Sequence, residues 1–285
     1  MLNHKLFFVI VHWGDENLTK RAVLSVKNNT SISKNRLIVV ANGASLKSED
    51  FDATILEIKE NRGYAVGVNA GINLAVMGGA SYVLVMNNDL EYQQGAAEAL
   101  LFGVENEFDC VGGTVQEGYK FSVKGGGRLS WLRGRTAPNF GKGKIDYVSG
   151  AFFLISRECF EKVGPIPEKY FHTWEDVAYS FLIRKKGLKI GYVDTPEIPH
   201  LRSQSMGESK IKTYYLVRNG SLFVREFASP LLKQWLLAVE EIRILWAILR
   251  RRWEIVYALL DAEKGISGKI DYRIDLASRP KSLWG

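Results

Sequence analysis

A chain of 285 residues is long enough to form one large domain or two small ones. Its 46% hydrophobic and 24% charged residues are typical of a globular protein. Cys110 and Cys159 are the only cysteines, and neither belongs to a Cys-x-x-Cys pair, which argues against a disulfide framework or a zinc site. The net charge of +7 favours anionic partners such as nucleotides, lipid head groups or nucleic acid, without choosing among them.

The N-terminus has no pattern of a secretory signal, because the apolar run of residues 6–11 is too short. No window reaches the roughly 18 uninterrupted apolar residues that a membrane-spanning helix needs. Together with the sparse cysteines, these features predict a cytoplasmic protein.

Strand-like and helix-like segments alternate in the first half of the chain. Strands are expected over residues 6–11, 37–40, 54–58 and 81–86, and helices over 17–28, 65–77 and 94–105. Asp15 or Asn17 can cap the first of these helices. This alternation predicts an α/β fold with a largely parallel sheet covered on both faces.

Glycines and arginines cluster over residues 111–144, which favours turns, short antiparallel strands or a long loop. A strand is expected over residues 147–156, a helix over 181–186 and a short strand over 189–193. We find no internal repeat and no low-complexity linker, so residues 1–228 are interpreted as one domain.

Residues 229–285 form a different segment, a C-terminal helical extension. From Leu232 to Leu260, apolar residues alternate in spacing of three and four, which indicates an amphipathic helix or helix pair. Arginines at 250–252 add positive charge beside it. Three alternatives stay open: packing on the main domain, formation of a dimer, or contact with an anionic membrane surface.

The strand expected at residues 81–86 runs directly into three polar residues, Asn87, Asn88 and Asp89. In an open α/β sheet, ligands bind at the edge where such strands end. One carboxylate flanked by amides suits a hard divalent cation that takes its other ligands from a substrate diphosphate. A simple Asn/Asp turn is the alternative.

Two earlier segments offer further candidates for ligand binding. Asn42 follows the second strand, and its amide suits the edge of a nucleobase. In the loop after the third strand, Arg62 suits a phosphate and small residues allow the backbone to approach a ligand. The spacing of Gly63, Gly67 and Gly71 misses GxGxxG, so a nicotinamide site is poorly supported.

Two adjacent carboxylates, Glu175 and Asp176, follow an aromatic cluster that includes Phe171 and Trp174. A carboxylate shielded by such rings can have a raised pKa and accept a proton, although acidic residues also favour any helix N-terminus. His200 follows the end of a proline-containing strand, where it is either structural or a metal ligand.

In this order, the features resemble those of family-2 inverting glycosyltransferases, and among them the rhamnosyltransferase-like enzymes of bacterial polysaccharide assembly. The resemblance runs from Phe8 to about Asn219, and residues 263–269 resemble the glycine-containing tail of such enzymes. It implies an α/β fold of the GT-A type, with a mostly parallel nucleotide-binding sheet flanked by helices and a C-terminal amphipathic helical segment after it.

The resemblance also implies roles for single residues. Asp176 matches the catalytic base, and Asp89 and His200 match ligands of Mg²⁺ or Mn²⁺. The expected donor-binding residues are Asn42, Asn61, Arg62, Gly63, Asn69, Asn87, Asn88 and Arg218. Three places depart from the family pattern. Val-His-Trp-Gly at residues 11–14 replaces a Thr-Tyr-Asn-like turn, Ala41-Asn42 stands where an acidic residue is usual, which leaves the base preference open, and Ala178 replaces a second Asp.

The expected function is inverting, metal-dependent transfer of a sugar, with rhamnose as the first candidate. The donor would be a dTDP- or UDP-sugar and the acceptor a glycan or lipid-linked glycan of a cell-surface polysaccharide such as O-antigen, at the inner face of the cytoplasmic membrane. The alternatives are a non-catalytic nucleotide-sugar or glycan-binding protein, a basic peripheral membrane or nucleic-acid adaptor, and a nucleotidyltransferase. The main domain lacks a dense basic stripe interleaved with aromatics, so nucleic acid is not an expected partner; a homodimer stays open.

Overall fold

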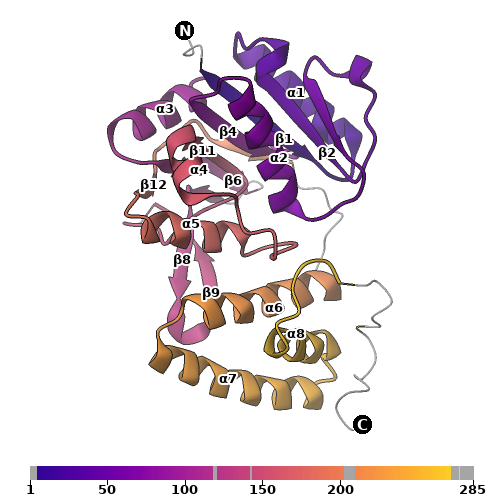
Figure 1. The fold of residues 1–285 in the computed structure, drawn as a ribbon, viewed down its shortest axis with the longest axis vertical. Helices are drawn as coiled ribbons and strands as arrows, with labels where there is room; N and C mark the ends of the chain where they lie inside the picture. Colours follow the sequence, from indigo (N-terminus) through magenta and orange to yellow (C-terminus); the bar gives the residue numbers. More distant parts are fainter. Residues whose placement is uncertain (1–4, 118–120, 142, 202–208, 271–275, 277–285) are drawn as a thin grey trace.

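The structure is a computed structural model that describes residues 5–117, 121–141, 143–201, 209–270 and 276. Its centre is a seven-stranded sheet in the order β12-β5-β11-β4-β1-β2-β3, above a layer of helices in Figure 1. Adjacent strands are parallel except at β11, which is antiparallel to both β4 and β5. The prediction of a mostly parallel sheet is therefore confirmed.

Five strands, β1 to β4 and β12, agree with the predicted ones to within a few residues, whereas β5 was not predicted and β11 is only part of a longer predicted strand. The central strands are continuous apolar runs because both faces of the sheet are covered. The bounds of the seven strands are β1 Leu6–His12, β2 Leu37–Asn42, β3 Thr54–Ile58, β4 Tyr82–Asn87, β5 Cys110–Gly112, β11 Phe152–Ser156 and β12 Ile190–Tyr192.

Helices cover the sheet on both sides. On one face the core contains residues of α1 and α3, and on the other it contains residues of α2, α4 and α5. Asp15 caps α1, since its Oδ1 accepts a hydrogen bond of 2.9 Å from Asn17 N. The bounds are α1 Glu16–Asn29, α2 Tyr64–Met77, α3 Ala96–Asn106, α4 Arg157–Val163 and α5 Glu175–Lys185, with short 3-10 helices at η1 Lys34–Arg36, η2 Ser48–Asp50 and η3 Trp131–Arg133.

The single strand predicted over residues 147–156 is wrong. The chain forms β10 (Tyr147–Val148), breaks at residues 149–151, and continues as β11 in another sheet. Tyr147 pairs with Gly127, whereas Phe152 pairs with Met86, so the chain has to bend between them. The bend brings residues 149–151 to the ligand-binding edge of the main sheet.

Two three-stranded sheets flank that edge. The first joins β10 to the hairpin of β8 (Gly126–Ser130) and β9 (Arg135–Pro138). The second joins β13 (Ile198–His200) to β6 (Thr114–Glu117) and β7 (Phe121–Lys124). These sheets confirm the expectation of short antiparallel strands in the glycine-rich region.

The last helices are α6 (Lys210–Phe227), α7 (Pro230–Leu249) and α8 (Trp253–Glu263). The sequence interpretation did not predict α6, which shares a core with α8. The predicted boundary at 228/229 falls between α6 and α7, and that division stays a prediction.

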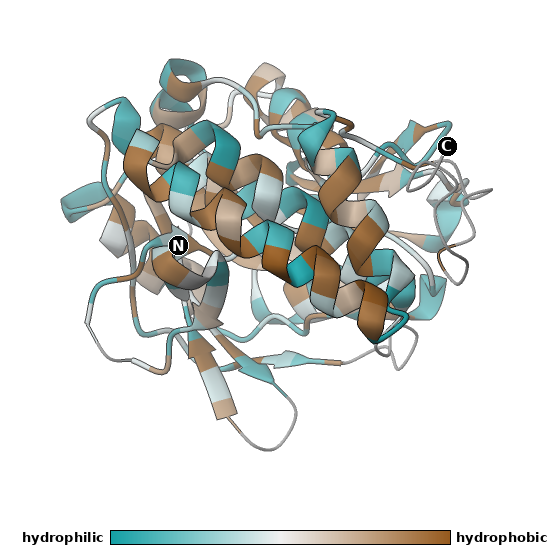
Figure 2. Ribbon diagram, turned by 90° about the horizontal axis from the view of Figure 1, so that it is seen from below, coloured by the Kyte–Doolittle hydropathy of each residue, from teal (hydrophilic) through white to brown (hydrophobic). Residues whose placement is uncertain are grey.

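The apolar pattern predicted from Leu232 to Leu260, here called the apolar seam, is divided between two helices by a bend at residues 250–252, where Arg251 has φ +53°. Beyond the bend, Val256 of α8 is buried, so packing accounts for that part of the seam. Much of α7 is hydrophobic, as the brown segments of its ribbon in Figure 2 show, yet several of its large apolar side chains are exposed. The "α7 face" is the set of its exposed large apolar residues: Leu231, Trp235, Ile242, Leu245, Trp246 and Leu249.

Within the described ranges, no helix combines the length and the apolar composition needed to cross a bilayer. Cys110 and Cys159 are both buried and free, as expected from their number and spacing.

Candidate active site

Polar residues follow directly after the apolar run of β4, and the structure gives them different environments. Asn88 is buried, and its Nδ2 donates to Trp13 O at 3.0 Å and to Thr19 Oγ1 at 2.9 Å, which ties the end of β4 to the start of α1. The Oδ1 atoms of Asn87 and Asp89 are buried without a partner among the described residues. Buried acceptors are normally hydrogen-bonded, so these two oxygens are available to a ligand.

His200 lies between two carboxylates. Its Nε2 is 3.0 Å from Asp89 Oδ2, and its Nδ1 is 2.9 Å from Glu117 Oε1. Burial opposes a charge on the ring, but the hydrogen bonds and charges of Asp89 and Glu117 outweigh it and raise the pKa of His200 to about 9.

Pairing of β13 with β6 sets His200 directly opposite Glu117. The sequence interpretation missed Glu117, because it stands in a glycine-rich segment 83 residues from His200 and no local pattern marks it. A carboxylate on the far nitrogen of a metal-ligating histidine fixes the orientation of the ring.

The residues present fit a divalent cation with few protein ligands. Asp89 and His200 are in contact, and Asp89 keeps one buried oxygen without a partner in the described chain. In the described ranges, no three His, Cys, Asp or Glu side chains are arranged to hold a metal ion together, so an ion at Asp89 and His200 would take further ligands from water or from a substrate. Mg²⁺ is commonly bound in this way, by one or two carboxylates and substrate phosphates.

The end of β2 and the loop after β3 meet at Asn42. Its Nδ2 donates to Gly63 O at 2.9 Å and lies 3.4 Å from Asn61 Oδ1, while its own Oδ1 is buried without a described partner. Asn61 Oδ1 also accepts from Gly63 N at 3.0 Å. Arg62 is exposed on the same loop. The predicted donor-binding residues at 42 and 61–63 therefore lie together.

Asn69 has a different task from the predicted one. Its Oδ1 accepts from Ile166 N at 2.9 Å, and its Nδ2 donates to Ile166 O at 2.9 Å and to Glu168 Oε1 at 3.1 Å. The buried amide thus holds the segment before Phe171 and has no hydrogen left for a donor.

Arg218 also departs from its prediction as a donor-binding residue. Its guanidinium is fully buried in α6, where Nε and Nη2 contact Asn219 Oδ1 and Nη2 also donates to Gly268 O. Only Nη1 lacks a partner among the described residues. A ligand at the sheet edge cannot reach a group with no exposed surface.

Glu175 and Asp176 begin α5 and differ in accessibility. Glu175 is buried, and its Oε2 has no partner in the described part of the chain. Asp176 is half-buried, and its Oδ2 accepts from Gly150 N at 3.1 Å while its Oδ1 accepts from Val177 N at 2.8 Å. Of the two carboxylates, Asp176 is the one that a substrate can reach.

Burial raises the pKa of Asp176, although backbone N–H donors oppose the rise, and this confirms the expected direction. Burial and the charge of Asp176 raise the pKa of Glu175 to about 8. Burial and the closeness of the two carboxyl groups therefore favour one proton on the pair near neutral pH.

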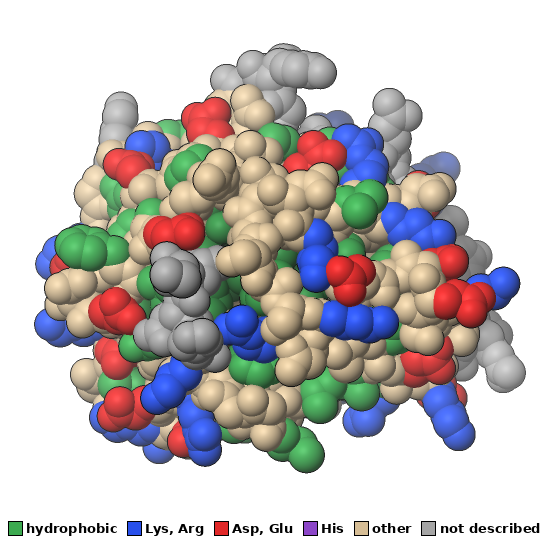
Figure 3. All heavy atoms as spheres, turned by 90° about the horizontal axis from the view of Figure 1, so that it is seen from above, with side chains coloured by type: hydrophobic (Ala, Val, Ile, Leu, Met, Phe, Trp, Pro, Cys, Tyr) green, Lys and Arg blue, Asp and Glu red, His purple; other side chains and the backbone are tan. Residues whose placement is uncertain are grey.

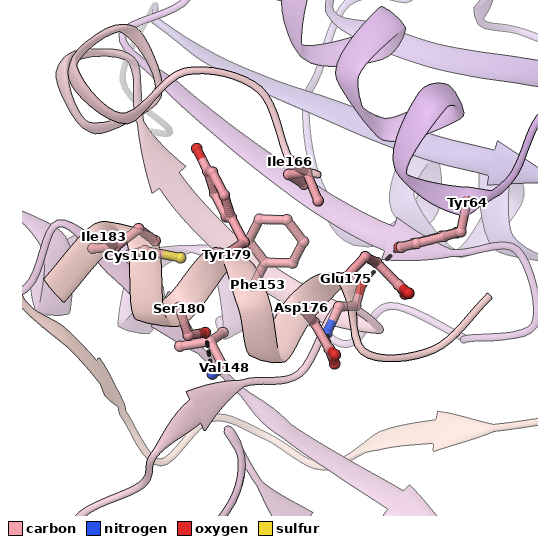
Figure 4. A pocket seen from close by; sticks show the side chains of 11 residues that line it. Tyr64, Cys110, Val148, Phe153, Ile166, Glu175, Asp176, Tyr179, Ser180 and Ile183 are labelled. Atoms are coloured by element: carbon pink, nitrogen blue, oxygen red, sulfur yellow. Dashed lines mark hydrogen bonds between the residues drawn. The ribbon is translucent and has the colours of Figure 1, made fainter. Parts of the chain in front are cut away.

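Residues 150–151 connect the C-terminal end of β4 with the first turn of α5. Asn87 N donates to Ala151 O at 2.9 Å, and Gly150 N donates to Asp176. Tyr64 reaches the same point, since its hydroxyl donates to Gly150 O at 2.6 Å (Figure 4). Burial raises the pKa of the Tyr64 hydroxyl, and nearby negative charges raise it further: those of Glu175, Asp176 and Asp89.

Behind Asp176 lies a cavity of about 20 Å³, lined mostly by apolar side chains that include Phe153 and Ile183 (Figure 4). Its volume suits about one water molecule and is far below the roughly 300 Å³ of a small-molecule site. It is therefore a void behind the carboxylate pair and not the place of a sugar.

A mostly parallel sheet with polar residues at its ligand edge and a carboxylate facing that edge matches the layout of the GT-A fold. The family model described as "Glycosyl transferase family 2" matches residues 7–164, more than half of the chain. The chain belongs to this family and is a glycosyltransferase.

Two curated relatives are similar over long stretches. The dTDP-rhamnosyl transferase RfbF of Shigella flexneri is 21% identical over 94% of this chain and 98% of its own length. The low-salt glycan biosynthesis hexosyltransferase Agl10 of Haloferax volcanii is 23% identical over 64% of each chain, so this chain spans less than two thirds of that relative.

Solved structures agree on the fold. GalNAc-T7, crystallised with UDP, GalNAc and Mn²⁺, superposes with a TM-score of 0.61 at 15% identity, over 78% of this chain and 47% of its own. TarS of S. aureus superposes with a TM-score of 0.54 at 11% identity, over 92% of this chain and 49% of its own. This chain spans about half the length of each neighbour, and at such identities the likeness shows the GT-A fold alone.

Proposed function

We propose that this glycosyltransferase inverts the anomeric centre of a nucleoside diphosphate sugar, with Asp176 as the base. The observation that carries the proposal is the half-buried Asp176 carboxylate, held by Gly150 beside the end of β4, where Asp89 and His200 present metal-ligating groups. Residues 150–151 link the two groups, since Ala151 O accepts from Asn87 N and Gly150 N donates to Asp176, and this contact supports a shared site.

In the proposed reaction, Asp176 accepts the proton of an acceptor hydroxyl. The hydroxyl oxygen forms a bond to the anomeric carbon from the face opposite the diphosphate, and the bond from that carbon to the diphosphate oxygen breaks. A Mg²⁺ or Mn²⁺ ion held by Asp89 and His200 would supply positive charge for the leaving diphosphate. Arg62 and the backbone near Gly63 would hold the donor, with Asn42 at the base. A single base on the far side gives inversion.

We propose a dTDP-sugar, with rhamnose first, as the donor, because the S. flexneri relative that covers nearly all of this chain is named a dTDP-rhamnosyl transferase. A UDP-sugar is the second choice. The proposed acceptor is a glycan or lipid-linked glycan of a cell-surface polysaccharide such as O-antigen.

The α7 face fits a lipid surface. Its six large apolar side chains form one stripe, and Arg250, Arg251 and Arg252 are exposed at its end. Tryptophans and leucines beside arginines suit the head-group region of an anionic bilayer. We propose that this face contacts the cytoplasmic membrane from the inside, where a lipid-linked acceptor would be found.

A nucleic-acid adaptor has less support. Figure 3 views the molecule from the side of the main sheet and shows acidic and basic side chains interspersed over the described part of this face. The basic residues behind the net charge of +7 therefore do not gather in one patch there.

A donor panel tests the proposed function. UDP-, dTDP- and GDP-sugars with Mn²⁺ are scored for release of the nucleoside diphosphate, with and without a lipid-linked acceptor. Asp176→Asn should lower kcat by roughly 10²–10⁴-fold with donor binding spared, because only the proton acceptor is lost. Asp89→Ala should weaken Mn²⁺-dependent donor binding. Full turnover by both variants would contradict the assignment, and donor binding without turnover by the parent protein would favour a non-catalytic binding protein.

A further inference from the structure

The segment directly before the carboxylate pair has an unfavourable backbone conformation. Thr173 has φ +65° and Trp174 has φ +73°, and neither is a glycine. Residues held in this region are strained and persist only when their surroundings hold them. Because α5 begins at the next residue, this turn sets the direction in which Asp176 points.

Asn219 of α6 holds the turn from one side. Its Nδ2 donates to His172 O at 2.8 Å and to Thr173 O at 3.1 Å. Both amide hydrogens are therefore used on consecutive carbonyls of the strained segment. The Asn219 side chain is fully buried, so water cannot replace these bonds.

The Trp174 side chain is held by the same helix. Its Nε1 donates to Leu216 O at 3.0 Å. The ring lies so close to α6 that a Cβ on Gly220 would stand 2.9 Å from it. The helix thus contacts every residue of the turn.

Arg218 fixes the amide of Asn219. Its Nε and Nη2 lie 3.0 and 2.9 Å from Asn219 Oδ1, so the amide oxygen faces the guanidinium and the amide hydrogens face the turn. The Arg218 guanidinium lies 5.3 and 4.9 Å from the ring centres of Tyr214 and Tyr215, which restrict it further.

The segment after α8 completes the arrangement. Gly268 O accepts from Arg218 Nη2 at 2.8 Å, and Gly268 N donates to Lys169 O at 2.7 Å. Ile270 N donates to the Tyr215 hydroxyl at 3.0 Å. A continuous series of contacts therefore runs from residues 268–270 through Arg218 and Asn219 to the turn at 172–174.

We propose that Arg218 and Asn219 are positioning residues, which hold the strained turn and thereby aim Asp176 at the acceptor. The inference rests on the proposed function, in which Asp176 is the base. It assigns neither residue to the donor, since both are fully buried and their bonds are made within the protein. It also gives the C-terminal segment a part in catalysis, because the Gly268 carbonyl holds Arg218.

Asn219→Asp tests the proposal. Asp has nearly the same shape and still accepts from Arg218, but its second oxygen faces the two carbonyls and cannot donate to them. We expect kcat to fall by roughly 10²-fold, the size of a misplaced reacting group, while calorimetric affinity for the nucleoside diphosphate of the active donor stays within about twofold. Arg218→Lys keeps the charge but loses the paired contacts, and should show the same split if Asn219→Asp does not fold.

Two controls separate positioning from general packing. Ser221 is buried in the same helix but accepts from Arg225 instead of contacting the turn, so Ser221→Ala should leave kcat unchanged. In an Asp176→Asn background, Asn219→Asp should cause little further loss, because the group that it positions is already gone.

The outcomes are distinct. Parental kcat in Asn219→Asp, an equal loss in Ser221→Ala, a full further loss in the double variant, or weaker nucleotide binding with unchanged kcat would each overturn the inference while leaving Asp176 as the base. Full turnover by Asp176→Asn would overturn the proposed function first, and the inference with it.

Discussion

Two neighbouring carboxyl groups at the start of α5 are in unequal environments. Glu175 is buried beside Tyr64, whereas Asp176 keeps some exposure and accepts two backbone hydrogen bonds. The raised pKa of Glu175, about 8, means that folding favours its protonated form. One proton on the pair avoids two adjacent negative charges and suits the role of base that we propose for Asp176.

This difference predicts how stability depends on pH. Below the ordinary pKa of 4.5, Glu175 is protonated in both the folded and unfolded protein, and its stabilisation is fully present. As the pH rises to about 8, the unfolded chain releases the proton while the folded protein retains it, so the free energy of unfolding falls. Glu175→Gln should remove this loss.

Thermal melts of Glu175→Gln and the parent protein check this prediction. The advantage of the variant in Tm should grow between pH 5 and pH 8 and stay constant above it. Glu49→Gln, at an exposed position, serves as the control and should show no such growth. A Tm difference that is independent of pH would contradict the protonated state of Glu175.

At the scale of elements, the loop of residues 61–63 and the segment before α5 meet at one glycine. Gly63 precedes α2 with φ +109°, and a Cβ there would lie 2.8 Å from Phe171 O. Tyr64 N also donates to that carbonyl, at 3.3 Å. The first turn of α2 and the segment that leads to α5 therefore hold each other.

Gly63→Ala should accordingly cost more stability than backbone conformation alone explains. Gly79 also has positive φ, +89°, but faces open space, so Gly79→Ala measures the conformational cost, about 1 kcal/mol. Gly63→Ala adds a backbone clash and should lose about 3 kcal/mol in urea denaturation. Equal losses in the two variants would show that the loops do not depend on this contact.

For the whole molecule, the α7 face predicts binding to vesicles. The protein should sediment with vesicles containing phosphatidylglycerol but not with phosphatidylcholine alone, and 0.5 M salt should weaken binding, because the arginines act through charge. Leu249→Glu should abolish it. Met77→Glu is a matched control, since Met77 is 84% and Leu249 83% exposed. If Leu249→Glu instead converts a dimer to a monomer in light scattering, the face binds a second copy.

The sequence predicted most of the main sheet, and the polar residues at its edge, because both depend on local patterns. The apolar run that begins at Val83 and stops at Asn87 is a local pattern that indicates the end of a strand. Glu117 and the role of Arg218 could not be predicted in the same way. Glu117 reaches His200 through pairing of two short strands, and the orientation of Arg218 depends on a carbonyl 50 residues later.

The contact between Gly268 and Arg218 has a consequence for biosynthesis. A nascent chain that has emerged only as far as α7 already contains every strand of the main sheet, yet its buried guanidinium still lacks the acceptor that Gly268 provides. During translation, the contact of Gly268 with Arg218 therefore forms after the sheet is complete. We expect the sheet to fold on the ribosome before the 172–174 turn holds Asp176, the proposed base, in its final orientation.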